Sequence, residues 1–145
     1  MLVRDILSSK QIGKILSVET TDTVTKAAVL LSETRIGAVI VRDAGNELDG
    51  ILSERDIVRE IGKRGVECME DKVSVLMTKE VKTCTPTHTT QAVMQMMTDG
   101  RFRHMPVMDE GKLIGVISIG DVVAARIKEV QFENESMADL IAGNI

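Results

Sequence analysis

Two stretches of this sequence carry side chains suited to binding an anion or a sugar hydroxyl. Residues 50–56 read GILSERD, and residues 115–121 read GVISIGD. Each stretch has a glycine, two branched apolar residues, a serine and, three positions later, an aspartate. The branched pair predicts the end of a buried strand, and the serine predicts the N-cap of a helix. Free backbone N–H groups and the helix dipole favour an anion at such a turn.

The same spacing has a purely structural explanation. Ser53 with Asp56, and Ser118 with Asp121, fit the capping box, in which a serine and an acid satisfy the free backbone groups of the first helical turn. A single copy of the pattern would favour the cap alone. Because two copies lie at corresponding places, an anion or ligand site and a simple cap both remain open.

Composition limits the classes of partner. The chain has 145 residues, of which 43% are hydrophobic, enough for one compact unit or two small units that share a core. Its net charge of -4 offers no general basic surface for nucleic acid or an anionic membrane. Phe102 and Phe132 are the only aromatic residues, so stacking platforms for single-stranded nucleic acid are lacking.

The cysteines and the apolar runs indicate the compartment. Cys68 and Cys84 belong to no CxxC or Cys/His cluster, so we predict reduced thiols and no metal site. No apolar run reaches the length of a membrane span, and the first residues do not resemble a signal peptide. These features predict a cytoplasmic protein without membrane association.

The apolar periodicity predicts one order of elements twice. The order is a short helix, an extended segment, a helix, a strand, a turn, a second strand and, after the Ser–Asp motif, a final helix. In the first copy the segments before the final helix are 3–7, 15–18, 24–31, 36–41, 43–46 and 48–53. In the second copy they are 73–77, 81–86, 89–97, 102–108, 109–112 and 113–118.

The register of the two copies is nearly constant. Arg35 and Arg101 are 66 positions apart, as are Asp43 and Asp109, and after one extra residue in the first turn the separation is 65. This regularity indicates an internal duplication. We therefore predict a first repeat over 1–65, a charged linker over 66–72 and a second repeat over 73–130. A tail over 131–145 is predicted to be helical in part, with a cap at residues 134–136.

Together these features resemble a tandem pair of CBS domains, named after cystathionine β-synthase and also called a Bateman module. The resemblance covers about residues 1–130 and rests on the two Gly-x-x-Ser-x-x-Asp turns and on RHMPV at residues 103–107. Small stand-alone bacterial CBS-pair proteins end similarly. The resemblance implies an α+β fold, in which two tandem β-α-β-β-α repeats pack as one pseudo-twofold module with two clefts between them.

The resemblance also implies a function. Family members bind adenosine nucleotides such as AMP, ADP or ATP, and in some cases NAD(H) or S-adenosylmethionine. Occupancy of the clefts regulates a partner protein, without catalysis. A homodimer through helix faces is the expected assembly.

Carried over by residue, the cleft of the second repeat is expected to be the primary site. Asp121 would accept hydrogen bonds from the ribose diol, and Ser118 with the following N–H groups would face the α-phosphate. Backbone before Pro86 would line the base, and Arg103 and His104 would reach phosphate. The residues assigned to this cleft are Thr83, Cys84, Thr85, Arg103, His104, Met105, Pro106, Val116, Ser118 and Asp121.

The same roles in the first repeat define a second cleft. Its strand, residues 37–40, lacks the cation, histidine and proline of the other copy, and Arg55 could compensate by reaching phosphates across the module. Unlike half-sites indicate either one stronger site or one extended dinucleotide across both. The residues assigned to this cleft are Ser17, Thr20, Ala38, Val39, Ile51, Ser53, Arg55 and Asp56.

Structural explanations stand beside these roles. His104 could be a core or rim histidine, and Arg101 and Arg103 could lie on a solvated strand face, with only one of them meeting ligand. No nucleophile with a matching base occurs, so no catalytic residue is assigned and an enzyme is a distant third reading. The alternative to a nucleotide sensor is a ligand-free scaffold, in which the serines act as caps only.

Overall fold

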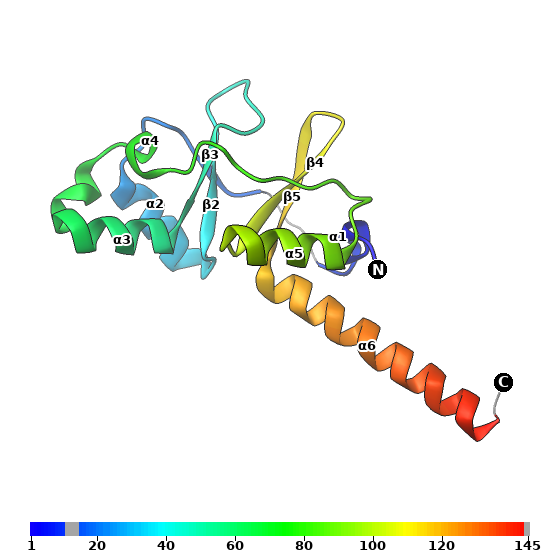
Figure 1. Ribbon diagram of the computed structural model, residues 1–145. Helices are drawn as coiled ribbons and strands as arrows, with labels where there is room; N and C mark the ends of the chain where they lie inside the picture. Colours follow the sequence, from blue (N-terminus) through cyan, green and yellow to red (C-terminus); the bar gives the residue numbers. More distant parts are fainter. Residues whose placement is uncertain (11–14, 144–145) are drawn as a thin grey trace.

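The computed structural model describes residues 1–10 and 15–143, and its elements follow the predicted order (Figure 1). The first half contains α1 (Val3–Ser9), β1 (Ser17–Val18), α2 (Val24–Thr34), β2 (Ala38–Val41), β3 (Gly50–Ser53) and α3 (Glu54–Arg64). The second half contains the 3-10 helix η1 (Val66–Glu70), α4 (Val73–Leu76), α5 (Thr90–Gly100), β4 (His104–Asp109), β5 (Lys112–Ser118) and α6 (Ile119–Ala142).

Strand pairing repeats between the two halves. β1 runs parallel to β2, with Val18 opposite Val41, and β2 pairs antiparallel with β3. In the second half β4 and β5 pair antiparallel, and the first strand is reduced to a parallel bridge between Cys84 and Val107. The bridge keeps the 66-residue register of the Val18–Val41 pair. The predicted α+β fold of two tandem repeats is thus confirmed, although the second repeat has only this remnant of its first strand.

The short opening helices exchange between the two cores. Val73 of α4 is fully buried among side chains of the first repeat, and Val3 of α1 is fully buried among side chains of the second. Backbone bonds fix both positions, because Val73 N–H donates to the Asp22 carbonyl at 2.7 Å and Val3 N–H donates to the His88 carbonyl at 2.9 Å. Each opening helix therefore closes the core of the other repeat.

The four longer helices share one end of the structure. Figure 1 shows α2 and α3 beside one another under the first strands, and α5 with the start of α6 under the second pair, while both hairpin loops project at the opposite end. Ser53 and Ser118 end their strands and begin α3 and α6 directly, without a connecting loop. The two Ser–Asp motifs are therefore held where strand and helix meet.

The segment predicted as a plain linker is folded. Residues 66–70 form η1, and Cys68 is fully buried where η1 packs against α2 and α3. The hydroxyl of Thr25 donates to the Met69 carbonyl at 2.8 Å, and Arg64 pairs with Asp71 at 2.5 Å. The charged residues of this stretch predicted a plain linker, but the buried Cys68 anchors it as a short turn.

The predicted cap at residues 134–136 is wrong. α6 runs without interruption from Ile119 to Ala142 and ends at Gly143, whose φ of 74° is left-handed. Asn134 and Ser136 are polar residues inside this helix, where their capping tendency is overridden by the continuous helical ladder. No helix within residues 1–10 and 15–143 is both long enough and apolar enough to span a bilayer.

The exchange of opening helices predicts an effect across the repeats. Val73→Ala should lower the free energy of unfolding by about 2 kcal/mol, because two methyl groups leave a buried site and a cavity remains. Val75→Ala on the same helix, where the side chain is 63% exposed, should change it by less than about 0.5 kcal/mol. Urea unfolding measures both values. Amide shift changes for Val73→Ala should concentrate on α2, and changes concentrated on α5 would contradict the exchange.

Candidate functional site

Both Ser–Asp motifs form capping boxes. The Ser53 N–H donates to Asp56 Oδ2 at 2.9 Å, and the Asp56 N–H donates back to Ser53 Oγ at 3.2 Å. Ser118 and Asp121 repeat this geometry with the same two distances. The capping explanation of the spacing is therefore correct for both motifs. A ligand site needs further groups around them, and these differ between the two motifs.

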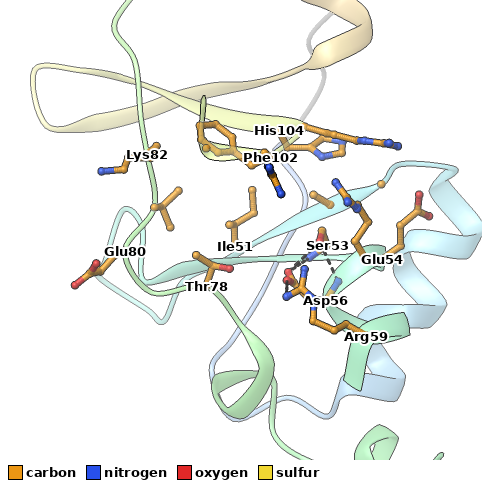
Figure 2. A pocket seen from close by; sticks show the side chains of 17 residues that line it. Ile51, Ser53, Glu54, Asp56, Arg59, Thr78, Glu80, Lys82, Phe102 and His104 are labelled. Carbon is orange, nitrogen blue, oxygen red and sulfur yellow. Dashed lines mark hydrogen bonds and ion pairs between the residues drawn. The ribbon is translucent and has the colours of Figure 1, made fainter. Parts of the chain in front are cut away.

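The first motif borders a cavity of about 360 Å³, here called the Ser53 cavity. In Figure 2 Ser53 at the end of β3 forms one wall together with Asp56 and Arg59 of α3. Phe102 and His104 form the opposite wall, and the segment from Thr78 to Lys82 forms a third. The motif of one repeat thus faces the extended segment and the pre-strand turn of the other repeat. The lining residues are Gly37, Ala38, Ile51, Ser53, Glu54, Arg55, Asp56, Arg59, Thr78, Glu80, Val81, Lys82, Gly100, Arg101, Phe102, Arg103 and His104.

The Ser53 cavity gathers positive charge. Five cationic side chains and three carboxylates line it. Arg59 lies 3.5 Å from Asp56, whereas within the part of the chain that the structure describes no carboxylate is in ion-pair distance of the other four cations. Unpaired guanidinium and ammonium groups beside a helix N-terminus suit a phosphate, and the Asp56 carboxylate suits a diol. The four cations without a carboxylate partner are Arg55, Lys82, Arg101 and Arg103.

The second motif borders a cavity of about 500 Å³, here called the Ser118 cavity. Its arrangement corresponds to that of the Ser53 cavity, because Ser118 of the second repeat faces residues of the first repeat that precede β1 and β2. Lys10 closes it at one side, because its ammonium donates to Asp121 Oδ2 at 2.8 Å and to the Val116 carbonyl at 3.1 Å. The lining residues are Lys10, Ile15, Leu16, Arg35, Ile36, Gly37, Ala38, Val39, Ile40, Ile51, His104, Val116 and Ser118.

A common wall separates the two cavities. Gly37, Ala38, Ile51 and His104 line both of them. A Cβ atom at Gly37 would lie 2.9 Å from His104 Cε1, closer than such atoms approach, so the imidazole occupies the space of a side chain there. The register makes Gly37 the counterpart of Arg103 and Ala38 the counterpart of His104. The histidine of the second repeat therefore excludes a matching cation from the first.

The imidazole of His104 is neutral at neutral pH. Burial lowers its pKa below the usual value, Lys10 and Arg103 lower it further, and Glu54 and Asp121 act in the opposite direction. A neutral imidazole still donates one hydrogen bond but contributes no charge. In this structure the positive charge near a ligand thus comes from the arginines and lysines.

Comparison with known proteins follows the same division of the chain. The sequence profile of the CBS domain matches residues 3–63 and again residues 72–128. The chain belongs to the CBS-domain family. A mitochondrial CBS domain-containing protein of Arabidopsis thaliana, CBSX3, is 37% identical over 97% of this chain and 72% of its own length.

Solved CBS structures share the fold. The crystal structure of a CBS-domain containing protein from Agrobacterium tumefaciens superposes with a TM-score of 0.82 at 42% identity, covering 86% of this chain and 92% of that one. The structure of CBSX2 in complex with AMP superposes with a TM-score of 0.70 at 25% identity, covering 88% and 96%. Relatives of this chain are thus CBS-domain proteins, and one solved neighbour carries AMP.

The residues that the sequence assigned to two nucleotide clefts are grouped differently in the structure of this CBS pair. We expected each Ser–Asp motif to share a cleft with the extended segment of its own repeat. The two repeats instead face each other, so each motif meets the extended segment of the other repeat. Ser53, Arg55, Asp56 and Arg103 line the Ser53 cavity, and Val39, Val116 and Ser118 line the Ser118 cavity.

Several assigned residues lie away from both cavities. Cys84, Met105 and Pro106 are buried in the second CBS core, and burial raises the pKa of the Cys84 thiol to about 11. Neither cavity is lined by residues 83–85 or by residues 17–20. The Thr20 hydroxyl bonds the Asp43 carboxylate at 2.8 Å, and Thr85 bonds the His88 ring at 3.0 Å. These threonines therefore act in turn structure.

Five cavity cations were missed as site residues. Lys10 and Arg35 line the Ser118 cavity, and Arg59, Lys82 and Arg101 line the Ser53 cavity. Arg35 and Arg101 are helix C-caps with the same left-handed φ of 55°, a conformation that non-glycine residues rarely adopt. Their equivalent positions in the two repeats, 66 residues apart, are the signal of this shared role in the sequence.

Metal and thiol chemistry have no visible basis in this CBS pair. Within residues 1–10 and 15–143 no three His, Cys, Asp or Glu side chains gather in a way that could hold a metal ion. Cys68 and Cys84 are free cysteines, and both are buried. The groups that converge on the cavities are cations, carboxylates and hydroxyls, which suit polar rather than metal ligands.

The Lys10–Asp121 pair predicts a pH-dependent contribution to stability. Burial would raise the pKa of Asp121, but the hydrogen bond and charge of Lys10, with help from Ser118, hold it below the usual value. A carboxyl with a lowered folded pKa contributes stability above its unfolded pKa of about 4 and loses it as the pH falls through the folded pKa. Lys10→Met should therefore destabilise the protein at neutral pH. The difference should shrink in acid, where only the bond from Lys10 to the Val116 carbonyl remains.

Urea unfolding across a pH series measures this difference. Lys79→Met, in an exposed loop, is the matched control and should unfold like the native protein at every pH. A Lys10→Met deficit that stayed constant down to strongly acidic pH would show that the lysine acts by packing alone.

The contact between Gly37 and His104 predicts a coupled pair. Gly37→Ala should lower the free energy of unfolding by about 1–2 kcal/mol, because the new methyl group overlaps the imidazole. His104→Ala in the same chain should recover most of that loss, giving a clear coupling in a double-mutant cycle. Gly62→Ala in α3, with no atom within 4 Å of the added methyl, should instead stabilise by about 0.5–1 kcal/mol. A Gly37→Ala protein as stable as the native one would refute the contact.

Proposed function

We propose that this protein is a regulatory module that binds an adenine nucleotide between its two CBS repeats and passes occupancy to a partner protein. One observation carries the proposal. In the Ser53 cavity the Ser53–Asp56 turn of one repeat faces unpaired Arg101, Arg103 and Lys82 of the other. A ligand with a phosphate at one end and a ribose diol at the other matches both sets of groups.

The position of the cavity supports a sensing role. A ligand in it would contact both repeats at once, so binding would favour any arrangement that brings the two walls to the right distance. Ile51, Val81, Ala38 and Phe102 supply apolar surface beside the charged groups, as a planar base requires. The AMP held by the neighbour CBSX2 supports this class of ligand.

The geometry favours the Ser53 cavity as the primary site, which reverses the expectation based on sequence. Asp121 already accepts a hydrogen bond from Lys10 at 2.8 Å, so a ribose there must displace an ion pair. Beside its capping bonds from Ser53, Asp56 has a longer contact with a cation, 3.5 Å to Arg59, and it lies among more cations. AMP, ATP and NAD(H) share the adenosine end that this site would recognise.

The second candidate function is a scaffold without ligand. It is favoured by the two complete capping boxes, which give both Ser–Asp motifs a structural role without any nucleotide. In that case the cavities would stay empty and the module would act only through its surface. For either function we propose a homodimer through helix faces and a cytoplasmic location.

Calorimetric titration of nucleotide-stripped protein separates the two functions. AMP, ATP, NADH and S-adenosylmethionine are the probes, and adenosine is the control without phosphate. We expect saturable binding of at least one nucleotide, with AMP tighter than adenosine because the cavity cations pair with phosphate. At 100 times the dissociation constant the nucleotide should add about 2.7 kcal/mol to the free energy of unfolding. No heat and no melting shift with any probe would favour the scaffold.

A matched pair of variants tests which cavity is used. Asp56→Asn should weaken nucleotide binding by about tenfold or more, because a charged acceptor for the diol is lost. Asp121→Asn should have a small effect. Asparagine keeps an oxygen that can accept the Ser53 or Ser118 N–H bond, so both caps should survive. A larger loss for Asp121→Asn would restore the ranking expected from the sequence.

A further inference from the structure

The end of α6 projects beyond the two repeats, and none of the described residues covers it. Figure 1 shows the second half of this helix extending away from the two repeats, and every residue from 131 to 143 is exposed. Isolated helices of about 12–15 residues are marginal in water. This one also exposes large apolar side chains, including Met137 at 57% and Ile141 at 83%. The helix therefore needs a partner surface.

Its exposed residues follow a heptad pattern. Positions that alternate by four and three residues form one stripe along the helix, the spacing of the a and d positions in a coiled coil. Successive residues are about 100° apart around the helix. The stripe is therefore turned about 130° from the face that packs on the module, which carries Val122 and Ala125. The stripe consists of Val123, Ile127, Val130, Asn134, Met137 and Ile141.

Asn134 identifies the occupant of the stripe as a second copy of this chain. With Ile127, Asn134 and Ile141 at a positions, a parallel pair would place Asn134 opposite its own counterpart, where the two amides can bond each other. An antiparallel pair would place Asn134 opposite Val130 and leave a buried amide unpaired, which is costly. A single asparagine at an a position is the pattern that fixes register and favours two parallel strands.

The flanking positions agree with self-pairing. In the parallel register Arg126 would face Gln131 of the second copy and Glu133 would face Ala138, so no like charges meet beside the seam. Three acids, Glu129, Glu135 and Asp139, fall on the outer positions. An acidic outer face is also unsuited to an anionic membrane surface, which attracts basic helices.

We propose that residues 123–141 of α6 pair in parallel with the same residues of a second copy, as a two-stranded coiled coil with Asn134 at its centre. These residues follow Ser118 along α6, whereas the strands precede it. None of them lines either cavity. The pairing therefore does not depend on nucleotide binding.

Sedimentation equilibrium of the full chain tests the seam. The native protein should be a dimer. Val130→Lys combined with Met137→Lys should raise the dissociation constant of the dimer by at least about tenfold, because two charges per chain enter the seam. Phe132→Lys combined with Ser136→Lys adds the same charge at exposed positions outside the seam and should leave the constant within about twofold. A native monomer, or equal effects of the two double variants, would overturn the proposal.

Disulfide trapping tests the direction of the pairing. Ile141→Cys should give a covalent dimer under mild oxidation, because like a positions are neighbours in a parallel pair. In the antiparallel pair the two residues would be about 27 Å apart, from 18 residues at 1.5 Å each. Asp139→Cys on the outer face is the control and should trap little, and Cys68 and Cys84 are buried and should not compete. Equal trapping by the two variants, or none by Ile141→Cys, would refute the parallel coiled coil.

Discussion

Neither repeat of this protein closes its own hydrophobic core, and the rest of the structure depends on that constraint. Val3 and Val73 are both fully buried, and each lies in the core of the repeat to which it does not belong in sequence. Removing either repeat would expose apolar surface of the other as well as its own. The two repeats are therefore held against each other, and the fold itself forms the space between them.

The cavities follow from the same exchange. Because the repeats face each other, the Ser–Asp turn of one meets the extended segment of the other. Neither cavity is therefore complete within a single repeat. Helix capping accounts fully for the spacing of serine and aspartate. It does not account for Arg55, Arg101 and Arg103, which converge on one cavity without carboxylate partners among the described residues. That excess of charge is the feature on which the proposed nucleotide site rests.

Local pattern and self-similarity predicted the order of elements, the duplicated register and the CBS family, because each of these depends on neighbours in sequence. The composition of the cavities could not be predicted in this way, since it depends on which repeat faces which. The contact of Lys10 with Asp121 spans 111 positions, and nothing in the pattern around either residue indicates it. The fold of residues 66–70 was hidden for a similar reason, because one buried cysteine outweighs a run of charge.

The difference between the two cavities has a single physical origin at their common wall. A duplicated chain begins with two equal halves, but one space cannot hold both the His104 imidazole and a side chain at position 37. With histidine in place, the first repeat has glycine where the second has Arg103. More cations therefore line the Ser53 cavity than the Ser118 cavity, whose lining has Lys10 and Arg35. The Ser118 side is connected differently, because α6 begins at its cap and continues for 24 residues as one helix. The Ser118 cap and the exposed stripe at the far end of α6 therefore belong to one continuous helix.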